Sequence, residues 1–307
     1  MSISVLAAKL LILLGQVVLA WFLTQEEFGV LAIVAAAAAC IKIFHDGGVP
    51  QVIVQRGNDE FERLQGAVFW IGLLVSLAGG ILLAAAASSI AAFYGEARLT
   101  PLFWVLAVTL PLGAPASTLR AKMQIDLRFR EISILNIANG VIRSIGMIVL
   151  AWFGFGLMCY VLPLLATALF AVAYTYRATR VSPWTQPPRF DQWPGLLADS
   201  YWVVFGTVSK AVSRNGDYLV LGRMLPKAVV GPYFFAYMLT MQITSLIGLN
   251  LRRVLYPVMT KFTDQPERQA SALLRSIRVL VLIAAGGCLL VAVVIEPLAT
   301  IMRREIW

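Results

Sequence analysis

The side chains best suited to bind a ligand in this sequence are cations inside strongly hydrophobic segments. Lys210, Arg214 and Asp217 follow one another at positions i, i+4 and i+7, so a helix would carry them on one face. Asn139 and Arg143 share a helical stripe in an earlier hydrophobic segment. Guanidinium and ammonium groups bind carboxylates and phosphates, so these positions predict contacts to an anion.

Two more cations, Lys9 and Lys42, also fall inside hydrophobic segments. A cation that faces lipid at the centre of a membrane helix costs about 2.5 to 3.5 kcal/mol, so it normally faces a bundle interior or a water-filled cavity. These positions therefore predict a cationic cavity. A structural role stays open, because an ion pair of Lys210 or Arg214 with Asp217 could fasten two helices, and long side chains near helix ends reach the interface.

The sequence contains no motif for enzyme chemistry. Its single histidine, His45, leaves an HExxH zinc motif or a Ser-His-Asp triad without the necessary residues, and no Gly-rich loop ends in the Gly-Lys-Ser/Thr that binds ATP. The three cysteines, Cys40, Cys159 and Cys288, lack the spacing of a disulfide framework or a zinc site. We therefore expect no catalysis, metal or cofactor.

Hydrophobic segments must position these residues, because the 307-residue chain is 60% hydrophobic and only 13% charged. Soluble domains carry about a quarter charged residues, and an apolar run of about 20 residues spans the roughly 30 Å hydrocarbon core. The sequence predicts an all-α integral membrane protein, a polytopic helix bundle. Its spans are expected near residues 3–23, 28–54, 64–93, 99–119, 132–152, 156–176, 196–222, 229–256 and 275–300.

Some spans contain residues that interrupt or tighten helices. Asp46-Gly47-Gly48 and Pro50 interrupt the second span, and Pro111 and Pro115 interrupt the fourth. We expect kinks or unwound turns at both places. Gly79-Gly80 predicts close packing between helices.

Basic residues are unevenly divided between the two alternating sets of predicted loops, one set carrying about three times as many as the other. The richer loops lie near residues 56–63, 120–130, 177–189 and 252–278, and the poorer ones near 98, 223–227 and 303–304. Positively charged loops stay in the cytoplasm, which predicts a cytoplasmic N-terminus. The net charge of +9 is spread over short loops without a basic stripe, so we expect no nucleic-acid binding.

Short motifs follow one another along nearly the whole chain in a fixed order. They are Glu27-Phe28-Gly29, Asp46-Gly47-Gly48 followed by Val54-Gln55-Arg56, Leu119-Arg120-Ala121-Lys122, Leu127-Arg128-Phe129-Arg130, Gly154-Phe155-Gly156, Asp217-Tyr218-Leu219-Val220-Leu221-Gly222, Gly231-Pro232-Tyr233 with Ala236, and Tyr256-Pro257. In this order and spacing the chain resembles the bacterial polysaccharide and O-antigen flippases. These proteins export lipid-linked oligosaccharides and belong to the multidrug/oligosaccharidyl-lipid/polysaccharide exporter superfamily.

The resemblance implies two six-helix lobes, related as parallel repeats around a central cavity. On this basis residues 1–180 form a six-helix N-lobe, 181–195 a cytoplasmic linker, and 196–307 an incomplete C-lobe of about three helices. Two full lobes need about twelve helices. We therefore expect either a truncated chain or further helices supplied from elsewhere.

The resemblance further implies that undecaprenyl-pyrophosphate-linked oligosaccharide is translocated across the bacterial inner membrane by alternating access, for lipopolysaccharide O-antigen or exopolysaccharide. The cavity cations would contact the pyrophosphate or an acidic sugar, with Asp217 as their orienting partner. The expected cavity residues are Arg143, Lys210, Arg214, Asp217, Asn139, Lys42 and Lys9. Expected partners are the lipid-linked oligosaccharide, membrane lipid and polysaccharide polymerase machinery. The alternatives are a cation-coupled multidrug exporter, which would favour an acidic cavity, and a truncated membrane fragment that does not transport.

Overall fold

The computed structural model describes residues 15–241, except 17, 20, 42–44, 46 and 239, together with a few residues between 271 and 293. The chain divides into two compact units, Met1–Gly231 and Pro232–Trp307, and the helices described below belong to the first unit. The predicted spans that begin at residues 3, 229 and 275 lie largely outside the described residues. The lobe boundaries expected from the sequence stay a prediction.

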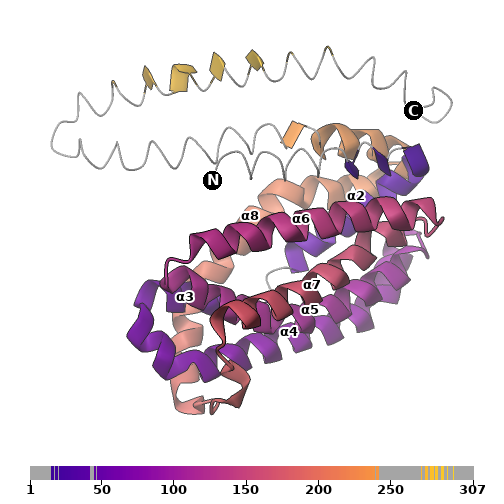
Figure 1. The fold of residues 1–307 in the computed structure, drawn as a ribbon. Helices are drawn as coiled ribbons and strands as arrows, with labels where there is room; N and C mark the ends of the chain where they lie inside the picture. Colours follow the sequence, from indigo (N-terminus) through magenta and orange to yellow (C-terminus); the bar gives the residue numbers. More distant parts are fainter. Residues whose placement is uncertain are drawn as a thin grey trace. The chain divides into compact units, whose positions relative to one another are not determined.

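The first unit is built from α-helices joined by short turns (Figure 1). Helices α4 to α7 are long and apolar enough to cross a membrane. At about 1.5 Å per residue, the 37 residues of α4 measure about 55 Å, which exceeds the roughly 30 Å hydrocarbon core. The protein is thus an all-α membrane helix bundle, as the sequence predicts. In chain order its elements are α2 (Gln25–Ile41), α3 (Val49–Arg56), α4 (Asn58–Tyr94), α5 (Leu99–Ile125), α6 (Phe129–Trp152), α7 (Met158–Thr179), the 3-10 turns η2 (Pro183–Thr185) and η3 (Phe190–Gln192), and α8 (Trp193–Met224).

Local sequence signals decide where several helices begin and end. A capping box opens α2, because the Thr24 backbone N–H donates to Glu27 Oε2 at 2.8 Å and the Glu27 N–H donates to Thr24 Oγ1 at 3.3 Å. The predicted break in the second span is confirmed, since Gly48, with φ of 75°, lies at the start of α3. Pro111 and Pro115, however, lie inside a continuous α5, so the unwound turn considered there is absent. Packing against neighbouring helices lets a membrane helix tolerate proline.

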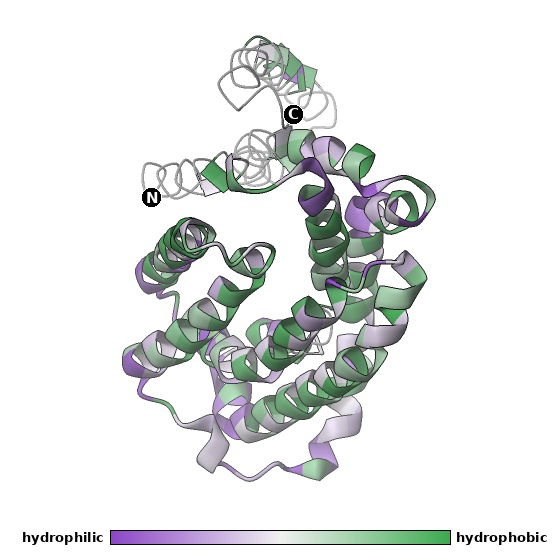
Figure 2. Ribbon diagram, turned by 90° about the vertical axis from the view of Figure 1, so that its right-hand side faces the viewer, coloured by the Kyte–Doolittle hydropathy of each residue, from purple (hydrophilic) through white to green (hydrophobic). Residues whose placement is uncertain are grey.

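The helices pack closely where their residues are small. Helix α4 packs along α5, α5 along α7 and α7 along α6, while α2 and α3 pack against α8 (Figure 1). A Cβ atom on Gly80 of α4 would lie 2.7 Å from the carbonyl oxygen of Ala107 in α5, so only glycine permits this approach. The predicted close packing is therefore confirmed at Gly80. Figure 2 shows hydrophobic residues along the helices of this unit.

Contacts between distant segments define two ends of the first unit. The Arg-rich end comprises the α3–α4, α5–α6 and α7–α8 connections, and there Lys122 Nζ donates to Asn58 Oδ1 at 2.6 Å. The Arg-poor end comprises the start of α2, the α4–α5 and α6–α7 connections and the turn after α8. Here Arg98 Nη2 lies 2.5 Å from Glu26 Oε1. Successive helix connections therefore lie at opposite ends of the unit, and the connections rich in basic residues share one end.

Candidate functional site

A cavity of about 730 Å³ lies among α2, α3, α5, α6 and α7. On α5 its lining runs from Leu106 to Gln124, near the end of the helix, and on α6 it runs from Leu135 to Arg143. The cavity thus extends from the middle of the unit toward the Arg-rich end. None of its described lining residues is acidic. The polar ones are His45, Gln51, Thr109, Ser117, Arg120, Gln124, Asn139, Arg143, Tyr160 and Thr167.

Arg143 reaches the cavity from the middle of α6. Its guanidinium carbon lies 5.0 Å from the centre of the Tyr160 ring of α7, a cation–π contact. The Nε of Arg143 and the Oδ1 of Asn139 are buried and have no hydrogen-bond partner within the described part of the chain. These are one buried donor and one buried acceptor, a single helical turn apart on α6, that a polar ligand or water reaching them would satisfy.

Arg120 is a second cation in the wall that the sequence analysis missed. The fourth span was expected to end at residue 119, which placed Arg120 in a loop; α5 instead continues to Ile125. The Arg120 guanidinium donates from Nη2 to Asn136 Oδ1 at 2.9 Å, which holds the side chain between α5 and α6. Its position could have been recognised from a helical stripe of small and polar residues. That stripe consists of Thr109, Gly113, Ser117, Arg120 and Gln124, spaced three or four residues apart.

The helix break between α2 and α3 brings His45 into the cavity wall. A Cβ atom on Gly113 would lie 2.1 Å from His45 Nε2, so the imidazole rests directly on the backbone of α5. Glycine at this position therefore makes room for the ring. Within the described residues, no group of His, Cys, Asp or Glu side chains is arranged to hold a metal ion.

The charged residues of α8 do not join this cavity. Lys210, Arg214 and Asp217 are exposed on α8, and none of them lines the cavity that contains Arg143. Asp199, near the start of α8, forms an ion pair with Arg56 at the end of α3 and so does not face a cavity cation. The predicted cavity residues therefore lie in two separate places. Asn139 and Arg143 line the cavity, whereas Lys210, Arg214 and Asp217 lie on the exposed face of α8.

The remaining predicted cavity residues, Lys9 and Lys42, lie outside the described residues. Of the expected set, Arg143 and Asn139 are the ones that the structure brings together in one cavity. Any ligand contact by these side chains remains a prediction.

One protein family matches most of the chain. The family described as polysaccharide biosynthesis protein matches residues 18–307. The succinoglycan biosynthesis transport protein ExoT of Rhizobium meliloti (strain 1021) is 20% identical over 294 residues, which cover 94% of this chain and 58% of ExoT. The lipopolysaccharide biosynthesis protein WzxC of Escherichia coli (strain K12) is 23% identical, covering 86% of this chain and 54% of WzxC.

A third relative matches over a shorter stretch of the chain. The teichuronic acid biosynthesis protein TuaB of Bacillus subtilis (strain 168) is 24% identical over 224 residues, which cover 72% of this chain and 46% of TuaB. The chain spans about half the length of the curated relatives that it matches. No solved structure matches it.

Proposed function

This chain belongs to the polysaccharide biosynthesis protein family, and we propose that it acts as a flippase for undecaprenyl-pyrophosphate-linked oligosaccharide in the bacterial inner membrane. The observation that carries the proposal is the cavity among the membrane helices, with Arg120 and Arg143 in its wall and no acidic residue among its described lining. Such a cavity favours an anionic cargo over a cationic one.

Arg143 is the proposed contact for the pyrophosphate. It lies near the middle of α6, the depth at which transporter sites typically lie. Its guanidinium lies in cation–π contact with Tyr160, and a guanidinium can donate the planar, two-point hydrogen bonding that phosphates accept. Arg120 adds a second positive charge to the same wall, and Asn139 offers an acceptor for a sugar hydroxyl.

Lys210 and Arg214 form a second proposed group of contacts, with Asp217 as their orienting partner. Their exposed position on α8 places them outside the described cavity, so they would meet the pyrophosphate or an acidic sugar at another stage of the translocation. The proposed lobes, residues 1–180 and 196–307 with the linker 181–195 between them, would move relative to each other during alternating access.

The direction of loading follows from the charge pattern. The cavity extends toward the Arg-rich end, and loops rich in Lys and Arg stay in the cytoplasm. The cargo would therefore enter from the cytoplasmic side, with the N-terminus on that same side. The polysaccharide polymerase machinery is the proposed recipient on the opposite face.

The two alternatives make different demands on the cavity. A cation-coupled multidrug exporter would need carboxylates to hold a cationic drug, and the described lining of this cavity supplies arginines instead. A membrane fragment that does not transport would need no cavity function at all. The relative ExoT is named a transport protein, which favours transport over catalysis.

Complementation tests the proposal. The chain would be expressed in a strain that lacks its oligosaccharide flippase, beside Arg143→Gln, Arg120→Gln and the matched control Arg63→Gln, which removes an exposed arginine at the Arg-rich end. Removing a charged hydrogen-bonding partner costs about 1.5 to 3 kcal/mol, or roughly tenfold or more in cargo affinity. We expect rescue of surface polysaccharide by the parent and the control, and a strong loss in the two cavity variants.

The parent and the variants are compared at equal levels of protein in the membrane. No rescue by a correctly inserted parent would favour the fragment that does not transport. Full rescue by Arg143→Gln would overturn the role of Arg143 in cargo binding.

A further inference from the structure

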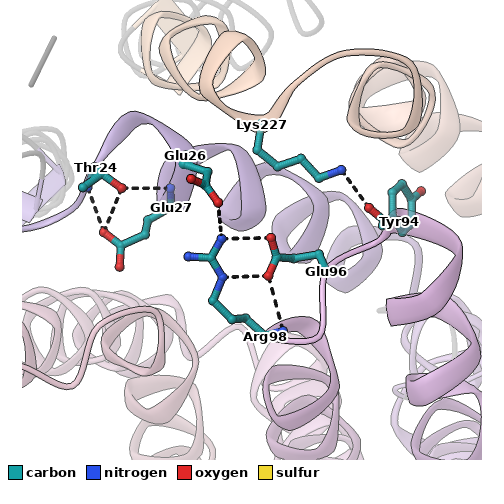
Figure 3. A network of polar contacts seen from close by, with 7 residues as sticks. All are labelled: Thr24, Glu26, Glu27, Tyr94, Glu96, Arg98 and Lys227. Carbon is teal, nitrogen blue, oxygen red and sulfur yellow. Dashed lines mark hydrogen bonds and ion pairs between the residues drawn. The ribbon is translucent and has the colours of Figure 1, made fainter.

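Three segments meet at the Arg-poor end of the first unit: the start of α2, the α4–α5 turn and the turn after α8 (Figure 3). Arg98 of the α4–α5 turn pairs with Glu96 at 2.6 Å and with Glu26 of α2 at 2.5 Å. The hydrogen bond between Arg98 and Glu96 lowers the pKa of Glu96 and raises the pKa of Arg98, so both stay charged at neutral pH. The α4–α5 turn is thereby held against α2.

Lys227 joins this arrangement from the first turn of the helical segment that follows α8. Its Nζ donates to the carbonyl oxygen of Tyr94 at 2.8 Å and to that of Gly222 at 3.1 Å. These carbonyls lie at the C-terminal ends of α4 and α8, where backbone oxygens lack helical partners and the helix dipole favours a cation. The Tyr94 hydroxyl donates in return to the carbonyl oxygen of Leu219 at 3.1 Å, so α4 and α8 are tied in both directions.

Two glycines allow the backbones at this end to touch. A Cβ atom on Gly29 of α2 would lie 2.1 Å from the carbonyl oxygen of Lys227, and one on Gly231 would lie 1.9 Å from that of Gln25. Each glycine thus lies against the backbone of the helical segment that carries the other. No residue with a side chain fits either position without pushing these two helical segments apart.

The opposite end of α8 is attached separately. Arg56 of α3 pairs with Asp199, and Leu196 lies in a hydrophobic core that it shares with α3 and α4. The first turns of α8 are therefore held by contacts separate from those at its C-terminal end. The cavity lining, which begins on α5 at Leu106, does not reach the Lys227 contacts.

We propose that Lys227, Tyr94 and the glycine pair Gly29 and Gly231 form a latch that keeps the Arg-poor end closed while the cavity is accessible from the Arg-rich end. This inference rests on the proposed transport function, because a carrier with alternating access must close one end while the other is open. The latch releases α8 when the cavity changes sides. Arg98 acts as a positioning residue that fixes the start of α2 for the glycine contacts.

Thiol labelling from each side of the membrane tests the latch without any cargo. The native cysteines would be replaced, and Thr109→Cys would report on the cavity lining of α5 close to Leu106, where that lining begins on the Arg-poor side. An Ala97→Cys variant in the exposed α4–α5 turn would identify that side in sealed vesicles. A membrane-impermeant maleimide would then be added to vesicles of each orientation, and the labelling rate measured.

Lys227→Met keeps an unbranched side chain, one atom shorter, and removes both hydrogen bonds. We expect it to raise the labelling rate of Thr109→Cys from the Arg-poor side by about tenfold, because charge-assisted hydrogen bonds to helix ends are lost. Gly231→Ala should act in the same direction by separating the backbones. Lys122→Met is the matched control: it removes the equivalent tether, to Asn58 and Asp126, at the Arg-rich end and should leave this rate unchanged.

Unchanged labelling in both Lys227→Met and Gly231→Ala, with each protein monodisperse and folded, would overturn the latch. An equal increase in Lys122→Met would do the same, because it would show general loosening. Since labelling needs no cargo, the latch can stand where complementation fails, and it can fail where complementation succeeds.

Discussion

Replacing Gly80 by alanine tests whether backbone contact holds the membrane helices α4 and α5 together. The added Cβ would lie 2.7 Å from the Ala107 carbonyl oxygen, about 0.7 Å closer than ordinary van der Waals contact. Overpacking of this kind costs about 1 to 3 kcal/mol, and the better helix propensity of alanine offsets up to about 1 kcal/mol. We therefore expect Gly80→Ala to lower the free energy of unfolding by about 1 to 2 kcal/mol.

Two companion variants separate this effect from helix propensity. Gly206→Ala, in α8, adds a Cβ with no atom within 4 Å, so it should be neutral or stabilising by up to about 1 kcal/mol. Ala107→Gly should not rescue Gly80→Ala, because the close contact is with a backbone oxygen that every residue carries. Unfolding would be followed by circular dichroism in mixed micelles with increasing SDS. Equal stability of Gly80→Ala and Gly206→Ala would refute the reasoning.

Two further predictions concern the ends of the unit. The hydrogen bond from Arg98 holds the pKa of Glu96 below its unfolded value of about 4.3, so its stabilisation is present above that pH and is lost as the pH falls through the folded pKa. Glu96→Gln removes this carboxylate, so the free energy of unfolding of the variant should fall less than that of the parent between about pH 5 and 3. An equal pH dependence in the two proteins would contradict this. At the Arg-rich end, Asp199→Asn should cost only about 0.5 kcal/mol, because the ion pair with Arg56 is partly exposed. Exchanging the two charges should restore that loss, whereas a loss above about 2 kcal/mol in the same unfolding assay would show a larger role for the pair.

The sequence predicted the helices of the described unit and their alternation between two ends. Apolar runs long enough to span a bilayer, separated by glycine, proline and charge, are local features that require little knowledge of neighbours. The break at Gly48 followed from the same local chemistry, since a glycine with positive φ before a proline ends one helix and begins another. Local signals were weaker at the end of the fourth span, where α5 runs on to Ile125 and carries Arg120 into the cavity wall.

Only the tertiary structure decided which polar residues share a site. Helical periodicity correctly placed Asn139 and Arg143 on one stripe, yet it could not say that Tyr160 and Arg120 would face them from other helices. Lys210 also lies on a charged stripe, but the packing of α8 against α2 and α3 leaves that stripe exposed and outside the cavity.

The same limit applies to the contacts at the two ends. Arg56 and Asp199 are 143 residues apart, and Lys227 binds the carbonyl oxygen of Tyr94, 133 residues earlier. Sequence periodicity determines which side chains share a face of one helix. The rotation of each helix and the choice of its neighbours depend on how all the helices pack at once, and for that reason the cavity and the latch became visible only in the folded chain.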